Sequence, residues 1–108
     1  MPPQWWLKAK ARPVHSYSEF MNLIKGECKS KVVFIDFYME YCKYCYLSLE
    51  DFNSAMDDML QLYGEENLCF LKVDGQKIPQ IASRYNVRSY PKFIGVEPGT
   101  EGKKFSIF

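Results

Sequence analysis

The most informative stretch of this chain is residues 34–45, FIDFYMEYCKYC. It overlaps an apolar run, 32–38, whose β-branched and aromatic residues are typical of a strand buried on both faces of a sheet. The one acid in that run is Asp36. Cys42 and Cys45 follow where we expect the strand to turn into a helix, and their spacing puts both sulfurs on one side of that helix, within disulfide reach.

This position favours thiolate chemistry at Cys42. The dipole and unpaired N–H groups at a helix start favour negative charge there, and Lys43 adds a nearby positive charge. A thiolate at Cys42 can attack the disulfide of a partner, and Cys45 can then resolve the mixed disulfide by displacing the reduced partner. The pair therefore indicates two-thiol exchange.

The same Cys-x-x-Cys spacing is half of a zinc site, which is the main alternative. Zinc needs two further ligands, but Cys28 and Cys69 are isolated in the sequence and His15 is the only histidine. We therefore expect no metal. We expect Cys28 and Cys69 to be small, partly buried hydrophobic residues and His15 to lie on the surface.

The rest of the chain predicts one α/β domain at residues 14–108, preceded by an N-terminal arm at 1–13 without a usable period. Periodicity and turn signals predict helices at about 17–28, 43–63 and 78–85, and strands at 32–38, 68–73, 92–96 and 103–108. The last two strands flank a turn-rich connection and should form an antiparallel hairpin. Strand, helix, strand and hairpin together indicate a mixed sheet flanked by helices.

The stretch around the cysteines resembles the active-site region of the thioredoxin family, in which a buried acid lies six residues before the first cysteine. Asp36 falls on that position. Residues 72–74 and 86–91 resemble the family's third-strand lysine and its cis-proline segment, with the family's spacing between them. The similarity covers about 14–108 and implies a thioredoxin fold. We expect the fold to lack the family's C-terminal helix, because the sequence stops at Phe108.

The resemblance implies a proton-transfer role for Asp36. It would lie beneath Cys45 and accept its proton, directly or through water, when Cys45 becomes the attacking thiolate. Burial raises the pKa of such a carboxyl toward the range of a general base, and Lys72 would moderate that rise. The alternative is a structural ion pair between Asp36 and Lys72.

The resemblance also implies a substrate-docking surface around the cysteines. We expect it to consist of Tyr41, Lys43, Tyr44, Tyr90 and Pro91. A cis bond before Pro91 would leave the backbone of Tyr90 facing the cysteines, free to pair with an extended substrate segment as an added strand.

Several positions depart from the usual thioredoxin pattern. Tyr41 stands where tryptophan is common, and Lys43 and Tyr44 replace glycine and proline, so the redox direction stays open. The residues around Pro91 partly resemble those of protein disulfide isomerase domains. No proline lies near Glu50, where the family's helix usually kinks, so we expect a straight helix.

These observations predict a thiol-disulfide oxidoreductase that reduces, forms or exchanges disulfides in protein substrates. Its redox group would be the Cys42–Cys45 disulfide, with no bound cofactor and electrons from an external thiol or a thioredoxin reductase. The alternative is a thioredoxin-fold module that binds or folds polypeptides with little turnover. We expect a cytoplasmic protein, or one of the ER lumen or secretory pathway if the chain is processed or truncated.

Charge and hydropathy exclude other classes of partner. Fourteen basic and thirteen acidic residues give a net charge of +1, too small a field to attract nucleic acid or anionic lipid. No apolar stretch reaches the roughly 20 residues of a membrane helix. Counting layers leaves part of one sheet face bare near Phe105 and Phe108, and we expect the Trp5–Trp6 arm or a second copy of the chain to cover it.

Overall fold

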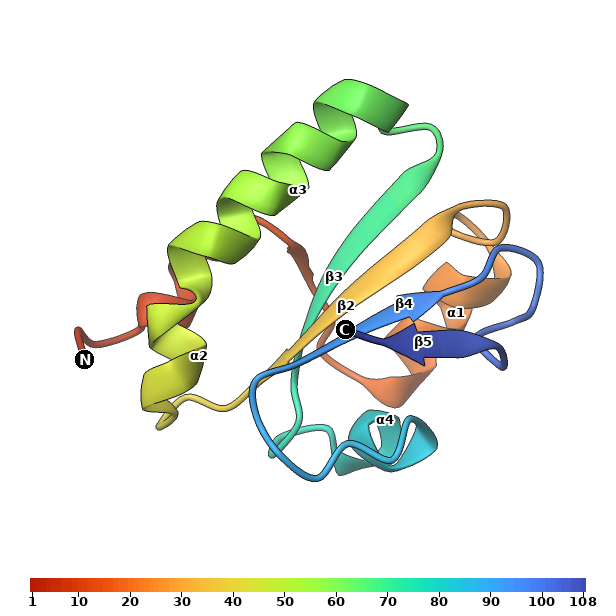
Figure 1. Cartoon of the computed structure of the whole chain (residues 1–108). Coiled ribbons are helices and arrows are strands. Elements are labelled where there is room, and N and C mark those ends of the chain that lie inside the picture. The colour runs from red at the N-terminus through yellow and green to blue at the C-terminus, as the bar shows by residue number, and fades with distance from the viewer.

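The centre of the fold is β2 (Val32–Tyr38), which lies in the middle of a five-stranded mixed sheet with the order β1-β3-β2-β4-β5. The computed structural model describes residues 1–108. In Figure 1, β3 (Leu68–Asp74) runs parallel to β2 on one side, and β4 (Lys92–Val96) runs antiparallel to it on the other. The short outer strands are β1 (Arg12–Pro13), parallel to β3, and β5 (Phe105–Ile107), antiparallel to β4.

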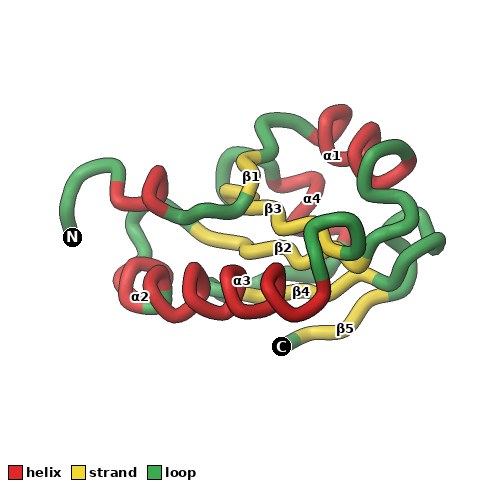
Figure 2. The backbone as a smooth tube through the Cα atoms, turned by 90° about the horizontal axis from the view of Figure 1, so that it is seen from above, coloured by secondary structure: helices red, strands yellow, loops and turns green.

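Helices cover both faces of this sheet, as Figure 2 shows. One face carries α1 (Tyr17–Lys25) and α4 (Pro79–Arg84), and the other carries α2 (Lys43–Leu47) and α3 (Leu49–Tyr63). The predicted α/β class, with a central mixed sheet flanked by helices, is therefore confirmed. No helix has the length and apolar character needed to cross a membrane.

The main core lies between the sheet and the α1–α4 layer. Alternate side chains of β2, such as Ile35 and Phe37, pack in it against side chains of the helix layer. These include Phe20 of α1, Ile81 of α4 and Tyr85 directly after α4. These side chains are fully or almost fully withdrawn from water, which is the main favourable term in folding. The core holds the carboxyl end of β2, and thus the start of the cysteine loop, in a fixed place.

The expected straight helix over 43–63 is wrong, because the chain forms two helices that meet at Ser48. The Ser48 hydroxyl donates a hydrogen bond of 3.0 Å to the carbonyl of Cys45. A serine that bonds back into the preceding turn competes with the regular helix pattern and bends the helix. A bend therefore occurs here without a proline.

The expectation that Cys28 and Cys69 are merely small, partly buried hydrophobic residues is also wrong, because the two residues form a disulfide. Cys28 is the buried residue of an otherwise exposed loop after α1, and Cys69 lies half-buried on β3, opposite Val33 of β2. This bond joins the α1 side of the core to the sheet.

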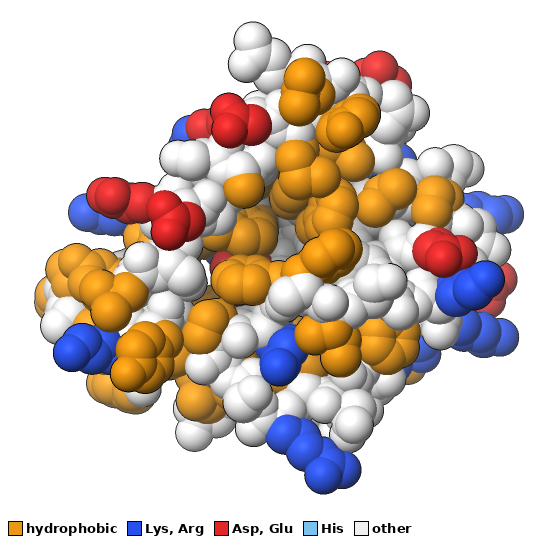
Figure 3. All heavy atoms as spheres, viewed as in Figure 1, with side chains coloured by type: hydrophobic (Ala, Val, Ile, Leu, Met, Phe, Trp, Pro, Cys, Tyr) orange, Lys and Arg blue, Asp and Glu red, His pale blue; other side chains and the backbone are white.

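The expectation that the N-terminal arm covers the last strand is not met. Trp5 packs at the opposite end of the sheet, beside α2, and Figure 1 shows the N-terminus at that end. An apolar groove of about 540 Å³ stays open between α3 and the strands, with the ring of Phe108 in its lining 6.0 Å from that of Phe34. Figure 3 shows hydrophobic side chains gathered in this hollow.

Candidate active site

The two cysteines lie where β2 and a short loop lead into α2. Cys42 is the residue that caps α2, and its sulfur accepts a hydrogen bond of 3.1 Å from the backbone N–H of Cys45. The two residues form a disulfide with a Cα–Cα distance of 5.2 Å. When the pair is reduced, the same N–H can stabilise a thiolate on Cys42, because a donor and the positive helix end favour the charged form.

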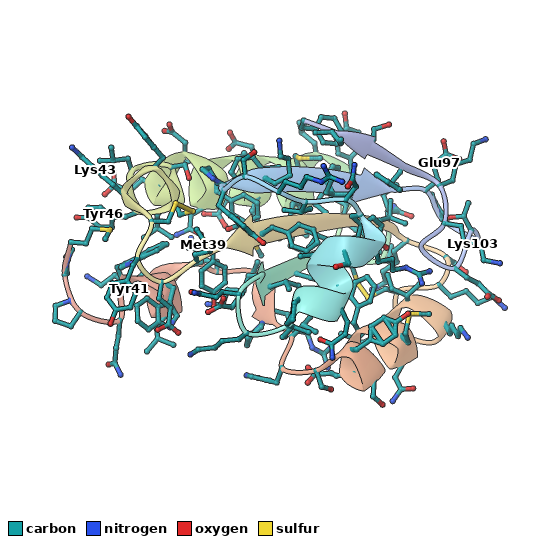
Figure 4. All side chains as sticks on the ribbon, turned by 90° about the horizontal axis from the view of Figure 1, so that it is seen from below. Met39, Tyr41, Lys43, Tyr46, Glu97 and Lys103 are labelled. Atoms are coloured by element: carbon teal, nitrogen blue, oxygen red, sulfur yellow. A yellow bond between two sulfur atoms is a disulfide. The ribbon has the colours of Figure 1, made fainter.

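The sulfurs are recessed, and tyrosines stand around them. Cys42 is 8% exposed and Cys45 is 4% exposed, whereas Tyr41 is 89% and Tyr44 71% exposed. Figure 4 shows Tyr41 and Lys43 at the same end of the molecule as the yellow disulfide. The structure thus brings the predicted docking residues of this loop together around the cysteines, and their contact with substrate stays a prediction.

Asp36 is a buried acid in the central strand of the sheet. Burial raises its pKa to about 7, and the neighbouring Lys72 ammonium opposes this rise. Lys72 occupies the facing position on β3. A carboxyl with a pKa close to neutrality is suited to proton transfer, because both of its protonation states are populated at neutral pH.

Lys72 makes its hydrogen bonds elsewhere. Its ammonium donates to the backbone carbonyls of Trp6, at 2.9 Å, and Ala9, at 2.8 Å, and it forms no ion pair with Asp36. The alternative of a structural Asp36–Lys72 ion pair is therefore not what the structure contains. Burial lowers the pKa of Lys72, and the carboxylate of Asp36 opposes that change.

The proline segment lies close to the cysteines through Tyr90. The Tyr90–Pro91 peptide bond is cis, and Tyr90 packs against both the main core and the cluster that contains Cys42 and Cys45. The Tyr90 hydroxyl lies so close to Gly75 that a Cβ there would overlap it, so a glycine is required at this position. The structure thereby brings both parts of the predicted docking surface to one end of the sheet.

Sequence reasoning missed Trp5 as a residue of this site. Its indole N–H donates a hydrogen bond of 2.8 Å to the carbonyl of Glu40, and its ring lies edge-on to Tyr38 and Tyr46, with centroids 6.0 and 5.9 Å away. The available signal was two adjacent tryptophans in an arm of otherwise poor pattern.

No metal centre accompanies the cysteines. No three His, Cys, Asp or Glu side chains are grouped so that they could hold a metal ion.

Comparisons with known proteins agree with this geometry. The thioredoxin family model matches residues 12–106. A thioredoxin H-type of Oryza sativa subsp. indica is 30% identical over 91 residues, covering 83% of this chain and 70% of that protein. The chloroplastic thioredoxin Y2 of Arabidopsis thaliana is 24% identical over 99 residues, and the chain spans about half of its length, 55%.

Solved structures show the same fold. The thioredoxin of Malassezia sympodialis superposes with a TM-score of 0.72 at 25% identity, covering 100% of this chain and 82% of that one. Both the order of the sheet and the position of the cysteine pair at a helix start thus occur within a known structural class.

Proposed function

Because this chain belongs to the thioredoxin family, we propose that it is a thiol-disulfide oxidoreductase that acts on disulfides of protein substrates through Cys42 and Cys45. The observation that carries the proposal is the Cys42–Cys45 disulfide at the start of α2, six residues after Asp36, a buried acid of β2 whose pKa is about 7. This arrangement supplies a nucleophile, a resolving thiol and a base.

The reductive reaction balances in two steps. The Cys42 thiolate attacks one sulfur of the substrate disulfide, forming a mixed disulfide and releasing the other substrate sulfur as a thiolate. The Cys45 thiolate then attacks the Cys42 sulfur, forming the Cys42–Cys45 disulfide and releasing the second substrate thiolate. The substrate gains two electrons and the cysteine pair loses them, so an external dithiol or a reductase must return two electrons for each turnover.

Asp36 acts in the second step as the base for Cys45. Cys45 is the more recessed of the two cysteines, and a thiol withdrawn from water loses its proton less readily. An ionised Asp36 takes this proton, directly or through a water molecule, at the moment of attack.

Substrate binds at the rim formed by the exposed tyrosines and the proline segment. Tyr41 and Tyr44 offer large, mostly exposed rings on one side of the sulfurs, and Tyr90 and Pro91 lie on the other. An extended substrate segment can pair with the backbone at Tyr90 as an added strand, which would hold its disulfide against Cys42.

The test is to trap the mixed disulfide with variants of each cysteine. A Cys45→Ser variant should accumulate a covalent complex with a disulfide-containing protein such as insulin, because Cys42 attacks and nothing resolves the product. A matched Cys42→Ser variant should accumulate none, and both should lose turnover with dithiothreitol as electron donor. A parent protein that binds insulin chains but reduces no disulfide would instead support the binding-module alternative.

The Cys28–Cys69 disulfide supports the oxidising alternative for location, the ER lumen or secretory pathway, over the cytoplasm. Structural disulfides persist in oxidising compartments and are rare in the cytosol. Rapid acid quenching of cells followed by thiol alkylation should find Cys28 and Cys69 oxidised. Free thiols at both positions would favour the cytoplasm.

A further inference from the structure

The N-terminal arm packs against the two cysteines of the active site, although residues 1–11 lie outside the thioredoxin family match. Trp5 is 4% exposed, as low as Cys45, in the cluster that also holds Ala9, Cys42 and Leu49. Burial of a tryptophan to this degree is unusual in a terminal segment, where the chain is commonly frayed. The arm is therefore part of the packing around the cysteines.

Polar contacts hold the arm in this position at three places. The Trp5 indole donates to the carbonyl of Glu40, in the loop just before Cys42. The Asn53 side chain of α3 accepts from the N–H of Lys10 at 2.9 Å and donates to the carbonyl of Lys8 at 3.0 Å. These two hydrogen bonds of Asn53 fix the backbone on both sides of Ala9.

The same backbone supplies the hydrogen-bond acceptors of Lys72. The carbonyls of Trp6 and Ala9 take two of its three donor positions, and Lys72 itself is 5% exposed. They compete with the Asp36 carboxylate, which faces Lys72 from the neighbouring strand. With the arm in place, the ammonium is bound to the carbonyls and is not paired with Asp36.

We propose that the arm is a working part of the site: Trp5 anchors the arm, the carbonyls of Trp6 and Ala9 in that arm hold Lys72 off Asp36, and this arrangement sets the pH range in which Asp36 accepts the proton of Cys45. Trp5 is thus a positioning residue, because it acts through Lys72 and Asp36 and does not touch the transferred proton. The inference rests on the proposed role of Asp36 in resolution.

Loosening the arm should lower the pKa of Asp36 for two separate reasons. If the arm is loosened, Lys72 is free to pair with Asp36, and an adjacent positive charge lowers the pKa of a carboxyl. Entry of water also lowers it, because burial is the main cause of its raised value. Both changes move the proton-accepting range of Asp36 to lower pH.

Other charged or titratable groups face this pair from neighbouring elements, and two of them, Tyr38 and Glu40, also contact Trp5. On β4 the position facing Asp36 is Phe93, with Lys92 facing the next residue of β2, and the Cys42 and Cys45 thiols lie at the start of α2. A pocket of about 260 Å³ beside Lys72 is also lined by five titratable side chains, His15, Tyr38, Glu40, Asp74 and Lys77.

The experiment measures only the resolution step, in which Cys45 attacks the mixed disulfide formed at Cys42. Reduced protein is mixed with one equivalent of Ellman's reagent: attack by Cys42 releases one thionitrobenzoate, and attack by Cys45 on the mixed disulfide releases the second in a step independent of concentration. The rate of this second step is measured from about pH 5 to about pH 9 in the parent, Trp5→Ala, Asn53→Ala and Leu62→Ala. Leu62→Ala is the control, because the Leu62 side chain is 74% exposed on α3 and lies outside the cluster around Trp5.

We expect the Asp36-dependent midpoint to fall from about pH 7 in the parent to about pH 6 or below in Trp5→Ala, with a smaller shift in Asn53→Ala and none in Leu62→Ala. In an Asp36→Asn background, Trp5→Ala should change nothing further. A midpoint unchanged in Trp5→Ala, or an equal effect of Trp5→Ala with and without Asp36, would overturn the inference.

Two safeguards keep the result decisive. If circular dichroism shows that Trp5→Ala is unfolded, Asn53→Ala decides, because it cuts only exposed hydrogen bonds, and an unchanged midpoint there refutes the inference. A parent protein that releases no second thionitrobenzoate would refute the proposed function itself. A parent that resolves normally while the variants match it would refute only the role of the arm.

Discussion

The two disulfides of this chain differ in every property that governs their chemistry. Cys42 and Cys45 are three positions apart, lie at a helix start and are surrounded by exposed tyrosines. Cys28 and Cys69 are 41 positions apart and join the loop after α1 to β3. A short bridge at a helix start can open without disturbing the fold, whereas a long one constrains the unfolded chain. We therefore expect the first to exchange and the second to stabilise.

The largest expected effect is on stability. Closing a loop of 41 residues lowers the entropy of the unfolded chain enough to stabilise the fold by about 4 kcal/mol, against about 2 kcal/mol for a loop of three. The double variant Cys28→Ala/Cys69→Ala should lose stability of that order, as measured by guanidinium unfolding of oxidised protein. Its turnover should stay within about twofold of the parent, because neither sulfur lies in the cluster around Trp5.

The matched control is Cys42→Ala/Cys45→Ala, which should lose about half as much stability and all of its turnover. Equal unfolding midpoints for the Cys28/Cys69 variant and the parent would show that this bridge is not a stabilising crosslink.

The second prediction concerns how much the buried Asp36 carboxyl lowers the stability of the folded protein. Burial gives Asp36 a pKa of about 7 in the folded protein, against its ordinary pKa of 3.8 in the unfolded chain. The protonated folded state is therefore favoured at low pH, and this contribution is lost as the pH rises through 7. At about pH 8, Asp36→Asn should be more stable than the parent by on the order of 3 kcal/mol, and at about pH 4 the two should be similar.

Denaturant midpoints at the two pH values check this, with Asp51→Asn on α3 as a control whose gain should be within about 0.5 kcal/mol. The same Asp36→Asn variant should resolve mixed disulfides at least about tenfold more slowly. A stability gain that is the same at both pH values would mean that Asp36 is not a buried acid that titrates near 7. The two regions would then differ in another way: the buried Asp36 would lower the stability of the fold only slightly, whereas the Cys28–Cys69 crosslink would raise it.

The elements that could be predicted from sequence are those whose partners are implied by local pattern. The run 32–38 is apolar except for Asp36, so β2 was located to the residue. Gly26 and Gly64 directly follow α1 and α3, and α1 ends three residues before the expected end at 28. The cysteines were singled out by their spacing at an expected helix start, and Asp36 by the resemblance to the thioredoxin family.

The features that were missed depend on contacts between distant parts of the chain. Nothing near Cys28 indicates Cys69, since the register of β3 against β2 must be known before the two can be paired. The carbonyls that bind Lys72 carry no sequence signal at all, because every residue has one. The bend at Ser48 was missed because serine is common inside helices and only its hydrogen bond reveals the break.

The smallest expected effect is a difference in the rate of reduction, and it compares the two disulfides directly. A thiol reductant must bring its sulfur in line with the bond that it attacks. Exposure does not separate the two bridges, because Cys42 is 8% and Cys45 4% exposed, whereas Cys28 is 1% exposed and Cys69 half-buried. The difference lies at the helix start, where the N–H of Cys45 donates to the Cys42 sulfur and stabilises it as a leaving thiolate. We expect dithiothreitol to reduce Cys42–Cys45 at least about tenfold faster than Cys28–Cys69 in the folded protein. Timed alkylation with iodoacetamide and mass analysis of the peptides measures both rates in one sample, and unfolding the protein in guanidinium should bring them together, because the helix start is then lost. If Cys28–Cys69 opened first in the folded protein, the assignment of exchange to one bridge and stabilisation to the other would have to be reversed.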